Sequence, residues 1–449
     1  MHFYAGVFVA PFLLLAALTG LLYAFSPQLE QIVHRDVLHA ERVAGNPLPL
    51  AEQVRAARTA HPEGMIKTVV PPDAPEETTR VVLNGVPGLG ELQRTVYVDP
   101  YTGKVLGART TEGTSMPVTT WLGELHRSLH LGDTGALYAE AAASWLWVIA
   151  VLGLLMWVVR RRHYRGTAPA RRALWHDRSA RGVRRTRGRH GALGLWAATG
   201  LLVVSITGLT WTDHAGARFD LLQERLDSTP PKLDTSLTGA PAGGAPAAGH
   251  GGHAHHGGAH SGAHDPDPVQ IDMVLATART AGITGPVEIS PPARPGHAWT
   301  VAETDNTWPV RKDKAAVDPT AQRVTDRVAF GDHPTMAKLT TLGIQFHMGR
   351  LFGPANQLFM AATALGLIVL VFWAYRMWWQ RRPTRADRRA PFGRPPARGA
   401  WRSLPTWTLI AGVPLMLAVA WAVPVLGVTL LAFLVIDALV GVLRRPRTS

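Results

Sequence analysis

The chain contains two copies of one pattern, in which a histidine stands at the start of an apolar stretch long enough to span a membrane. His2 and His190 are each followed by a glycine four residues later and by Thr-Gly-Leu seventeen residues later. A second matching pair is His126 and His347. We therefore expect a duplicated two-helix unit. The other matched positions are Gly6 and Gly194, Thr19 and Thr207, Gly132 and Gly353, Trp157 and Trp378, and Arg160 and Arg381.

Six apolar stretches are predicted to form membrane helices, since an α-helix needs about 20 apolar residues to cross about 30 Å of hydrocarbon. Four stretches reach this length singly. A fifth is almost twice as long, with Pro424 in its middle, and predicts a hairpin. The expected fold class is a mainly α integral membrane protein, with a four-helix core bundle and a C-terminal two-helix hairpin. The predicted spans are 1–25, 141–160, 190–212 and 357–380, with the hairpin at 405–443.

The distribution of arginine predicts the orientation of these spans. Residues 160–189 contain twelve arginines and one acid, and residues 376–402 contain nine arginines and one acid. Short loops this basic lie in the cytoplasm. Six spans place the basic segments 161–189, 381–404 and 444–449 on one side, so we expect a multi-pass protein with both termini cytoplasmic. The net charge of +14 then reflects topology, and no nucleic acid partner is expected.

Two long polar segments, 26–140 and 213–356, are expected outside the cytoplasm, each with a small α+β module. In the first, a helical pattern begins at Leu50, and alternating strands lead to a turn at 99–103, whose Asp, Pro and Gly are typical turn residues. The second segment repeats this weakly, with a helix over 268–281. Neither segment clusters a nucleophile with a base, which favours a binding or supporting role.

A linker over residues 238–268 is rich in Gly, Ala and Pro and is not expected to bury a core. It contains six histidines, and imidazole binds Cu²⁺, Ni²⁺ and Zn²⁺. A divalent-metal site and an incidental low-complexity insert both fit this composition. The six residues are His250, His253, His255, His256, His260 and His264.

The four repeated histidines predict a cofactor site. An imidazole within a membrane is costly unless it has a partner, so such residues usually face the bundle interior and serve function. Haem iron accepts axial imidazole, and bundle cores build cofactor sites from facing helices. The chain has no cysteine, which excludes iron–sulfur clusters and c-type haem. Topology pairs His2 with His190 at the inner face and His126 with His347 at the outer face, giving two haem b groups.

Two other histidines are alternatives for the outer ligand. His130 lies one helical turn from His126, and His214 lies at the outer end of the third span, about 36 Å along a helix from His190. In the alternative arrangement of the outer site, His130 or His214 takes the place of His126 as the haem ligand.

Four further residues are expected to support the two sites. Gly6 and Gly194 lie one turn from their histidines, where a missing side chain admits a porphyrin or a neighbouring helix. Arg127 and Arg350 lie beside the outer site, where each either pairs with a haem propionate or anionic substrate or simply anchors the helix end.

The motifs together resemble the PepSY-associated transmembrane family over about residues 1–382. The resemblance is carried by the His-to-Thr-Gly-Leu span, by Leu-His-Arg-Ser-Leu-His-Leu-Gly at 125–132 and by Val-Asp-Pro-Tyr-Thr-Gly-Lys-Val at 98–105. Members are bacterial inner-membrane proteins with four core helices and external PepSY-like modules, and some are di-haem reductases that release iron from ferric siderophores. The resemblance implies axial-ligand roles for His2, His126, His190 and His347. The linker and the hairpin are additions, so substrate identity is not carried over.

The expected function is that of a haem-b electron-transfer protein in the bacterial cytoplasmic membrane. It would reduce an extracytoplasmic ferric siderophore or other metal species, as a membrane-bound metalloreductase. Because the inner loops are short and arginine-rich, we expect a separate electron donor, either a membrane quinol or another reductase. The alternative is a haem-free envelope metal-binding or regulatory PepSY protein, whose histidines only satisfy interfacial hydrogen bonds.

Overall fold

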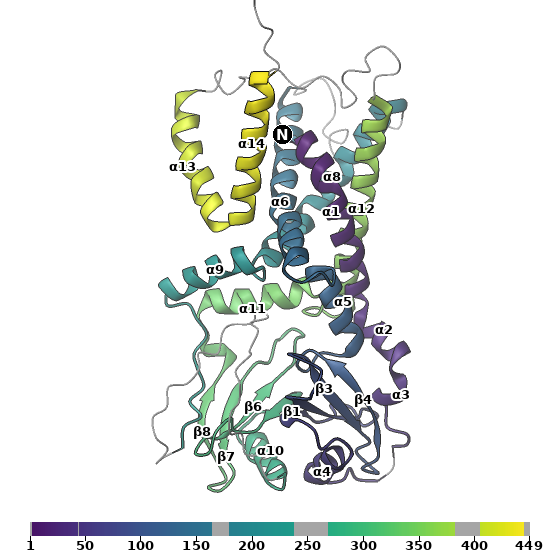
Figure 1. Cartoon of the computed structure of the whole chain (residues 1–449), viewed down its shortest axis with the longest axis vertical. Coiled ribbons are helices and arrows are strands. Elements are labelled where there is room, and N and C mark those ends of the chain that lie inside the picture. Colours follow the sequence, from purple (N-terminus) through teal and green to yellow (C-terminus); the bar gives the residue numbers. More distant parts are fainter. Residues whose placement is uncertain (1, 44, 164–178, 238–267, 382–404, 444–449) are drawn as a thin grey trace, which may run out of the picture. The chain divides into compact units, whose positions relative to one another are not determined.

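The computed structural model describes residues 2–43, 45–163, 179–237, 268–381 and 405–443. The chain divides into two compact units, and each half of the sequence repeat contributes to both (Figure 1). The first unit comprises Met1–Leu22, Leu125–Leu222 and Leu358–Ser449, and the second comprises Tyr23–Glu124 and Gln223–Gln357.

Four long helices of the first unit are apolar and long enough to cross a membrane. Buried side chains from all four form one hydrophobic cluster, with Ala10 and Leu13 from the first helix, Leu146 from the second, Leu201 from the third and Leu370 from the fourth. The helices therefore share a core, in agreement with the predicted helical membrane protein. They are α1 (His2–Ala24), α6 (Gly132–His163), α8 (Gly182–Leu209) and α12 (Pro354–Arg381).

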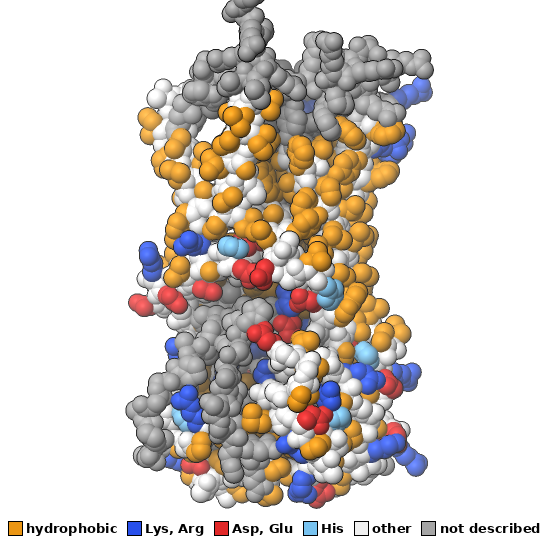
Figure 2. Space-filling view, in the orientation of Figure 1, with side chains coloured by type: hydrophobic (Ala, Val, Ile, Leu, Met, Phe, Trp, Pro, Cys, Tyr) orange, Lys and Arg blue, Asp and Glu red, His pale blue; other side chains and the backbone are white. Residues whose placement is uncertain are grey.

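The outward faces of these helices carry large apolar side chains. Phe8, Trp196 and Leu365 are 66%, 60% and 50% exposed, and hydrophobic side chains cover this unit in Figure 2. Soluble monomers rarely expose contiguous apolar surface on this scale. A lipid bilayer is the environment that such a surface requires.

Two of these helices extend beyond the predicted spans. Helix α6 begins at Gly132, ahead of residue 141, and α8 begins at Gly182, inside the predicted loop 161–189. The α6 extension mixes apolar residues with Asp133 and Glu140, and α8 starts with several arginines, which are good helix formers. Apolar length predicts the segment within the hydrocarbon, but the helix itself continues as far as its backbone hydrogen bonds do.

The C-terminal residues of the first unit form the predicted hairpin. Helices α13 (Thr406–Ala422) and α14 (Pro424–Leu443) are separated by Val423, and α14 lies against α6. Their apolar parts, Ile410–Ala422 and Pro424–Val440, are shorter than those of the four long helices. The structure thus contains four candidate spans among the described residues, and a membrane crossing by the hairpin stays a prediction.

The second unit is built around one antiparallel sheet of eight strands, in the order β4-β3-β2-β1-β5-β6-β7-β8. The predicted helix at Leu50 and the strands on both sides of the turn at 99–103 are present, as is the predicted helix of the second module. The strands are β1 (Met65–Val70), β2 (Thr79–Asn84), β3 (Gln93–Val98), β4 (Val105–Thr111), β5 (Val287–Ser290), β6 (Trp299–Glu303), β7 (Lys314–Asp318) and β8 (Arg323–Val328).

Short helices accompany this sheet and connect it to the long helices. They are α2 (Ser26–Val33), α3 (Arg35–Leu38), α4 (Leu50–Ala60), α5 (Pro117–Ser128), α10 (Gln270–Thr280), the 3-10 helix η1 (Phe330–Asp332) and α11 (Thr335–His347). Helix α9 (Asp213–Arg225) begins in the first unit and ends in the second.

The two segments expected to form separate modules share a single sheet. Strands β1 and β5 pair through Val69 and Ile289, and the hydroxyls of Thr68 and Ser290 lie 3.0 Å apart across this junction. Helices α4 and α10 pack on the same face, and their apolar side chains belong to one core with the strands. Pairing the two inner strands leaves each module only one edge strand, which limits exposure of unpaired backbone groups.

Candidate functional site

His2 and His190 make the same hydrogen bond from equivalent places in the repeat. The Nδ1 atom of His2 lies 3.1 Å from the carbonyl oxygen of Ile149 in α6, and the Nδ1 atom of His190 lies 3.1 Å from the carbonyl oxygen of Leu370 in α12. Ile149 and Leu370 are themselves repeat counterparts, with the same sequence separation as His126 and His347. The repeat is therefore preserved at the level of single contacts.

This contact determines the tautomer of each ring. A carbonyl oxygen only accepts hydrogen bonds, so Nδ1 must carry the proton and Nε2 must carry the lone pair. Histidines that ligate metals usually donate their other N–H to a carbonyl or carboxylate, which also holds the ring orientation. Both rings therefore have the tautomer that axial ligation of haem iron requires.

The glycines one turn from these histidines differ in their surroundings. Among the described residues, a Cβ built on Gly6 meets no heavy atom within 4 Å, and one built on Gly194 meets only a Leu370 methyl at 3.7 Å. Helix α12 therefore reaches ordinary van der Waals distance at Gly194, whereas the space beside Gly6 is open. The open space beside Gly6 is compatible with the predicted porphyrin, since a flat ligand can lie against the histidine-bearing face there.

His2 and His190 both belong to the first unit. Their helices, α1 and α8, contribute to the same buried core. The pairing of the two rings at one inner haem site stays a prediction.

His126, near the end of α5, is anchored to α1. Its Nδ1 atom lies 2.8 Å from the Thr19 hydroxyl, which itself donates to the Leu15 carbonyl oxygen at 2.9 Å. The hydroxyl has one hydrogen, so it accepts from Nδ1–H, and Nε2 again carries the lone pair. Gly20 permits the approach, because a Cβ there would lie 3.1 Å from the His126 ring. The repeated Thr-Gly-Leu motif was visible in the sequence, but its role as a histidine support was not.

Burial keeps the His126 ring neutral. Desolvation, reinforced by the charge of Arg127, lowers the pKa of His126 to about 4. The ring is therefore unprotonated at pH 7, which is the state that binds a metal.

His347 ends α11 and belongs to the second unit. The chain then turns through Gly349, where the backbone N–H groups of Arg350 and Leu351 both donate to the Gln345 carbonyl oxygen. Because His126 belongs to the first unit, the pairing of His126 with His347 stays a prediction. Arg350 lies within electrostatic range of the half-buried Lys312 in the same unit.

The two alternative outer ligands have different surroundings. His130 is exposed in the turn between α5 and α6, with a left-handed backbone (φ 55°). His214, whose side chain is 53% exposed, donates from Nδ1 to Glu140 at 3.0 Å. Glu140 is 1% exposed and also accepts the backbone N–H of Ala215 at 2.9 Å, so it caps the start of α9. Sequence reasoning overlooked Glu140, although an acid at the edge of an apolar span was the available signal.

No group of three metal-binding side chains occurs among the residues that the structure describes. The six linker histidines, from His250 to His264, lie outside those residues.

A family model described as the PepSY-associated TM region matches residues 1–381. The match covers most of the chain, which belongs to this family. No curated protein matches the chain.

Proposed function

We propose that this PepSY-associated membrane protein is a haem-b electron carrier that reduces a ferric siderophore or other metal species outside the cytoplasm. The observation that carries the proposal is the repeated Nδ1 contact of His2 and His190 with the carbonyl oxygens of Ile149 and Leu370. Interfacial histidines have no need of identical backbone partners at repeat-related positions. Two axial ligands of one inner haem do need a defined tautomer and orientation.

Each histidine has a specific task in this proposal. His2 and His190 would hold the inner haem, while His126 and His347 would hold the outer one. His126 is preferred to His130 and His214 because its ring is the most buried of the three and is supported by Thr19. When bound, haem b supplies one-electron redox chemistry, and the apolar helices around it tune the potential.

The remaining parts of the proposal concern the two faces of the membrane. The basic segments favour cytoplasmic termini and the bacterial inner membrane. Arg127 and Arg350 would then pair with propionates or with an anionic ferric chelate. The electron donor would be a membrane quinol or a separate reductase.

The test is a haem count on the full-length protein purified after expression with haem supplied. We expect a Soret band, and a pyridine haemochrome assay giving two haem b per chain. His190→Ala and His126→Ala should each lose about one haem. His39→Ala, which alters a partly exposed histidine of the second unit, should retain both.

A haem-free protein is the competing outcome. Absence of a Soret band in the haem-supplied protein would reject the proposal and favour a metal-binding or regulatory envelope protein. Retention of both haems by His190→Ala would reject the assigned inner ligands.

A further inference from the structure

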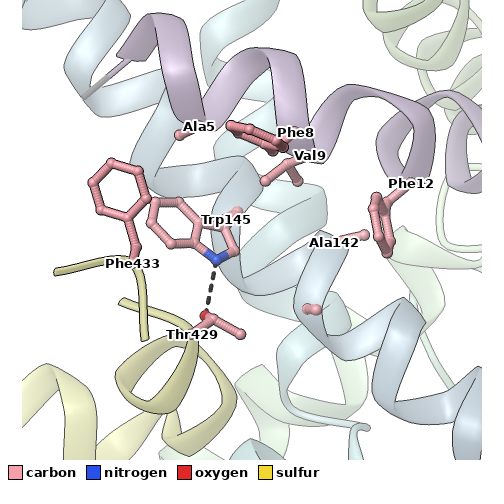
Figure 3. Close-up of a pocket in the computed structure, with 9 residues that line it drawn as sticks. Ala5, Phe8, Val9, Phe12, Ala142, Trp145, Thr429 and Phe433 are labelled. Carbon is pink, nitrogen blue, oxygen red and sulfur yellow. Dashed lines mark hydrogen bonds between the residues drawn. The ribbon is translucent and has the colours of Figure 1, made fainter. Parts of the chain in front are cut away.

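An apolar cavity of about 320 Å³ lies in the first unit between α1, α6 and α14 (Figure 3). Four aromatic side chains, those of Phe8, Phe12, Trp145 and Phe433, contribute to its lining, together with small alanines such as Ala5. Aromatic walls with small residues between them suit a flat ring, because offset aromatic stacking adds to the gain from apolar burial. The volume is at the lower end of that of small-molecule sites.

The wall contributed by α14 contains the polar contact of the cavity. Trp145 donates from Nε1 to the Thr429 hydroxyl at 3.0 Å, and that hydroxyl donates to the Val425 carbonyl oxygen at 2.7 Å (Figure 3). Both the indole N–H and the hydroxyl are donors, and a ring carbonyl oxygen can accept from either donor when it replaces that donor's present acceptor. An acyl chain would gain nothing from such a pair.

The cavity is adjacent to the proposed inner ligand. Ala5 stands three residues after His2 on α1. On α6, Trp145 lies one turn, about 6 Å, before Ile149, and the carbonyl oxygen of Ile149 contacts the His2 ring. A redox-active ring in the cavity would therefore lie beside the site where electrons would enter.

We propose that this cavity binds the ring of a membrane quinone or quinol, an inference that rests on the proposed electron-transfer function. The third wall comes from the C-terminal hairpin, which lies beyond the residues matched by the family model. The role of the hairpin would then be to supply the third wall of the quinone site, whose other two walls come from α1 and α6. As one quinol becomes quinone, its two O–H bonds break, the two electrons reduce two ferric haems by one electron each, and the two protons leave to bulk water.

The first test measures binding to the full-length protein independently of haem. A photoreactive azido-quinone is expected to label peptides from α6 and α14, and excess decylubiquinone should prevent this labelling. Ala5→Phe fills the cavity and should reduce labelling at least tenfold. Ala364→Phe makes the same change on α12, away from the cavity, and should leave labelling unchanged. Thr429→Val retains the shape but removes the hydroxyl, and should weaken protection by decylubiquinone about tenfold.

The second test separates this inference from the proposed function. Under anaerobic conditions, decylubiquinol should reduce the haem of the wild-type protein. Ala5→Phe should slow this reduction at least tenfold while its haem content and its dithionite-reduced spectrum stay normal. Equal labelling of Ala5→Phe and wild type, or a bound phospholipid chain that decylubiquinone does not displace, would overturn the quinone site. A wild-type protein without haem would refute the proposed function, while the labelling result would still decide the cavity.

Discussion

Gly200 offers a quantitative test of how the membrane helices pack. It lies in α8, where a built Cβ would stand 2.6 Å from the Thr363 hydroxyl oxygen and 3.3 Å from Phe359 Cζ, both in α12. Thr363 cannot rotate away without cost, because its hydroxyl donates to the Phe359 carbonyl oxygen at 2.9 Å. Gly200→Ala should therefore force the two helices apart or break that hydrogen bond.

The expected cost follows from a comparison with Gly191 on the same helix. A Cβ on Gly191 meets no described heavy atom within 4 Å. Both Gly→Ala changes gain about 1 kcal/mol of helix propensity. Overpacking at Gly200 costs about 1–3 kcal/mol. The difference in stability between the two variants isolates the packing effect, so Gly200→Ala should be about 1–3 kcal/mol less stable than Gly191→Ala.

The assay is unfolding of the full-length protein in mixed micelles, titrated with sodium dodecyl sulfate. Thr363→Ala removes both atoms of Thr363 that the new methyl group would meet, at 2.6 Å and 3.1 Å. The double variant of Gly200→Ala and Thr363→Ala should therefore recover most of the loss, with a coupling energy of about 1 kcal/mol or more. Equal unfolding midpoints for Gly200→Ala and Gly191→Ala, or no coupling with Thr363→Ala, would refute the close-contact argument.

Two further predictions concern the sheet-containing unit. The Asp272 carboxylate accepts hydrogen bonds from the backbone N–H groups of Leu50 at 2.7 Å and Ala51 at 3.0 Å, so a residue of α10 caps the start of α4. Asp272→Ala should lower the free energy of unfolding by about 1–2 kcal/mol and speed hydrogen exchange in α4. Unchanged exchange in α4 would contradict this prediction. Burial lowers the pKa of Lys312 from 10.5 to about 8. The unfolded chain then binds more protons between these values, so stability should rise as pH increases from 8 to 10.5. Lys312→Met should flatten this rise, as measured by denaturant midpoints at pH 7 and pH 10; an equal slope in the variant would contradict the assignment.

The membrane helices and the candidate inner ligands were predictable from the sequence because both depend on local patterns. An apolar run of about 20 residues is sufficient to define a spanning helix. The duplication singled out His2 and His190, since a chance histidine would not recur at the same offset from Gly and Thr-Gly-Leu. The turn at Asp99 was predictable for the same reason, because its side chain bonds the backbone N–H groups of nearby Tyr101 and Thr102.

Tertiary structure alone decided the features that depend on partners distant in sequence. The histidines bond the backbone oxygens of Ile149 and Leu370, and every residue carries such an oxygen, so no side-chain pattern could identify them. The junction between β1 and β5 joins Val69 to Ile289, a pairing that neither strand encodes locally. The sequence by itself determined the four candidate membrane-spanning helices and the repeated histidines. Only three-dimensional packing determined which carbonyl groups orient those histidines and where α14 encloses a cavity.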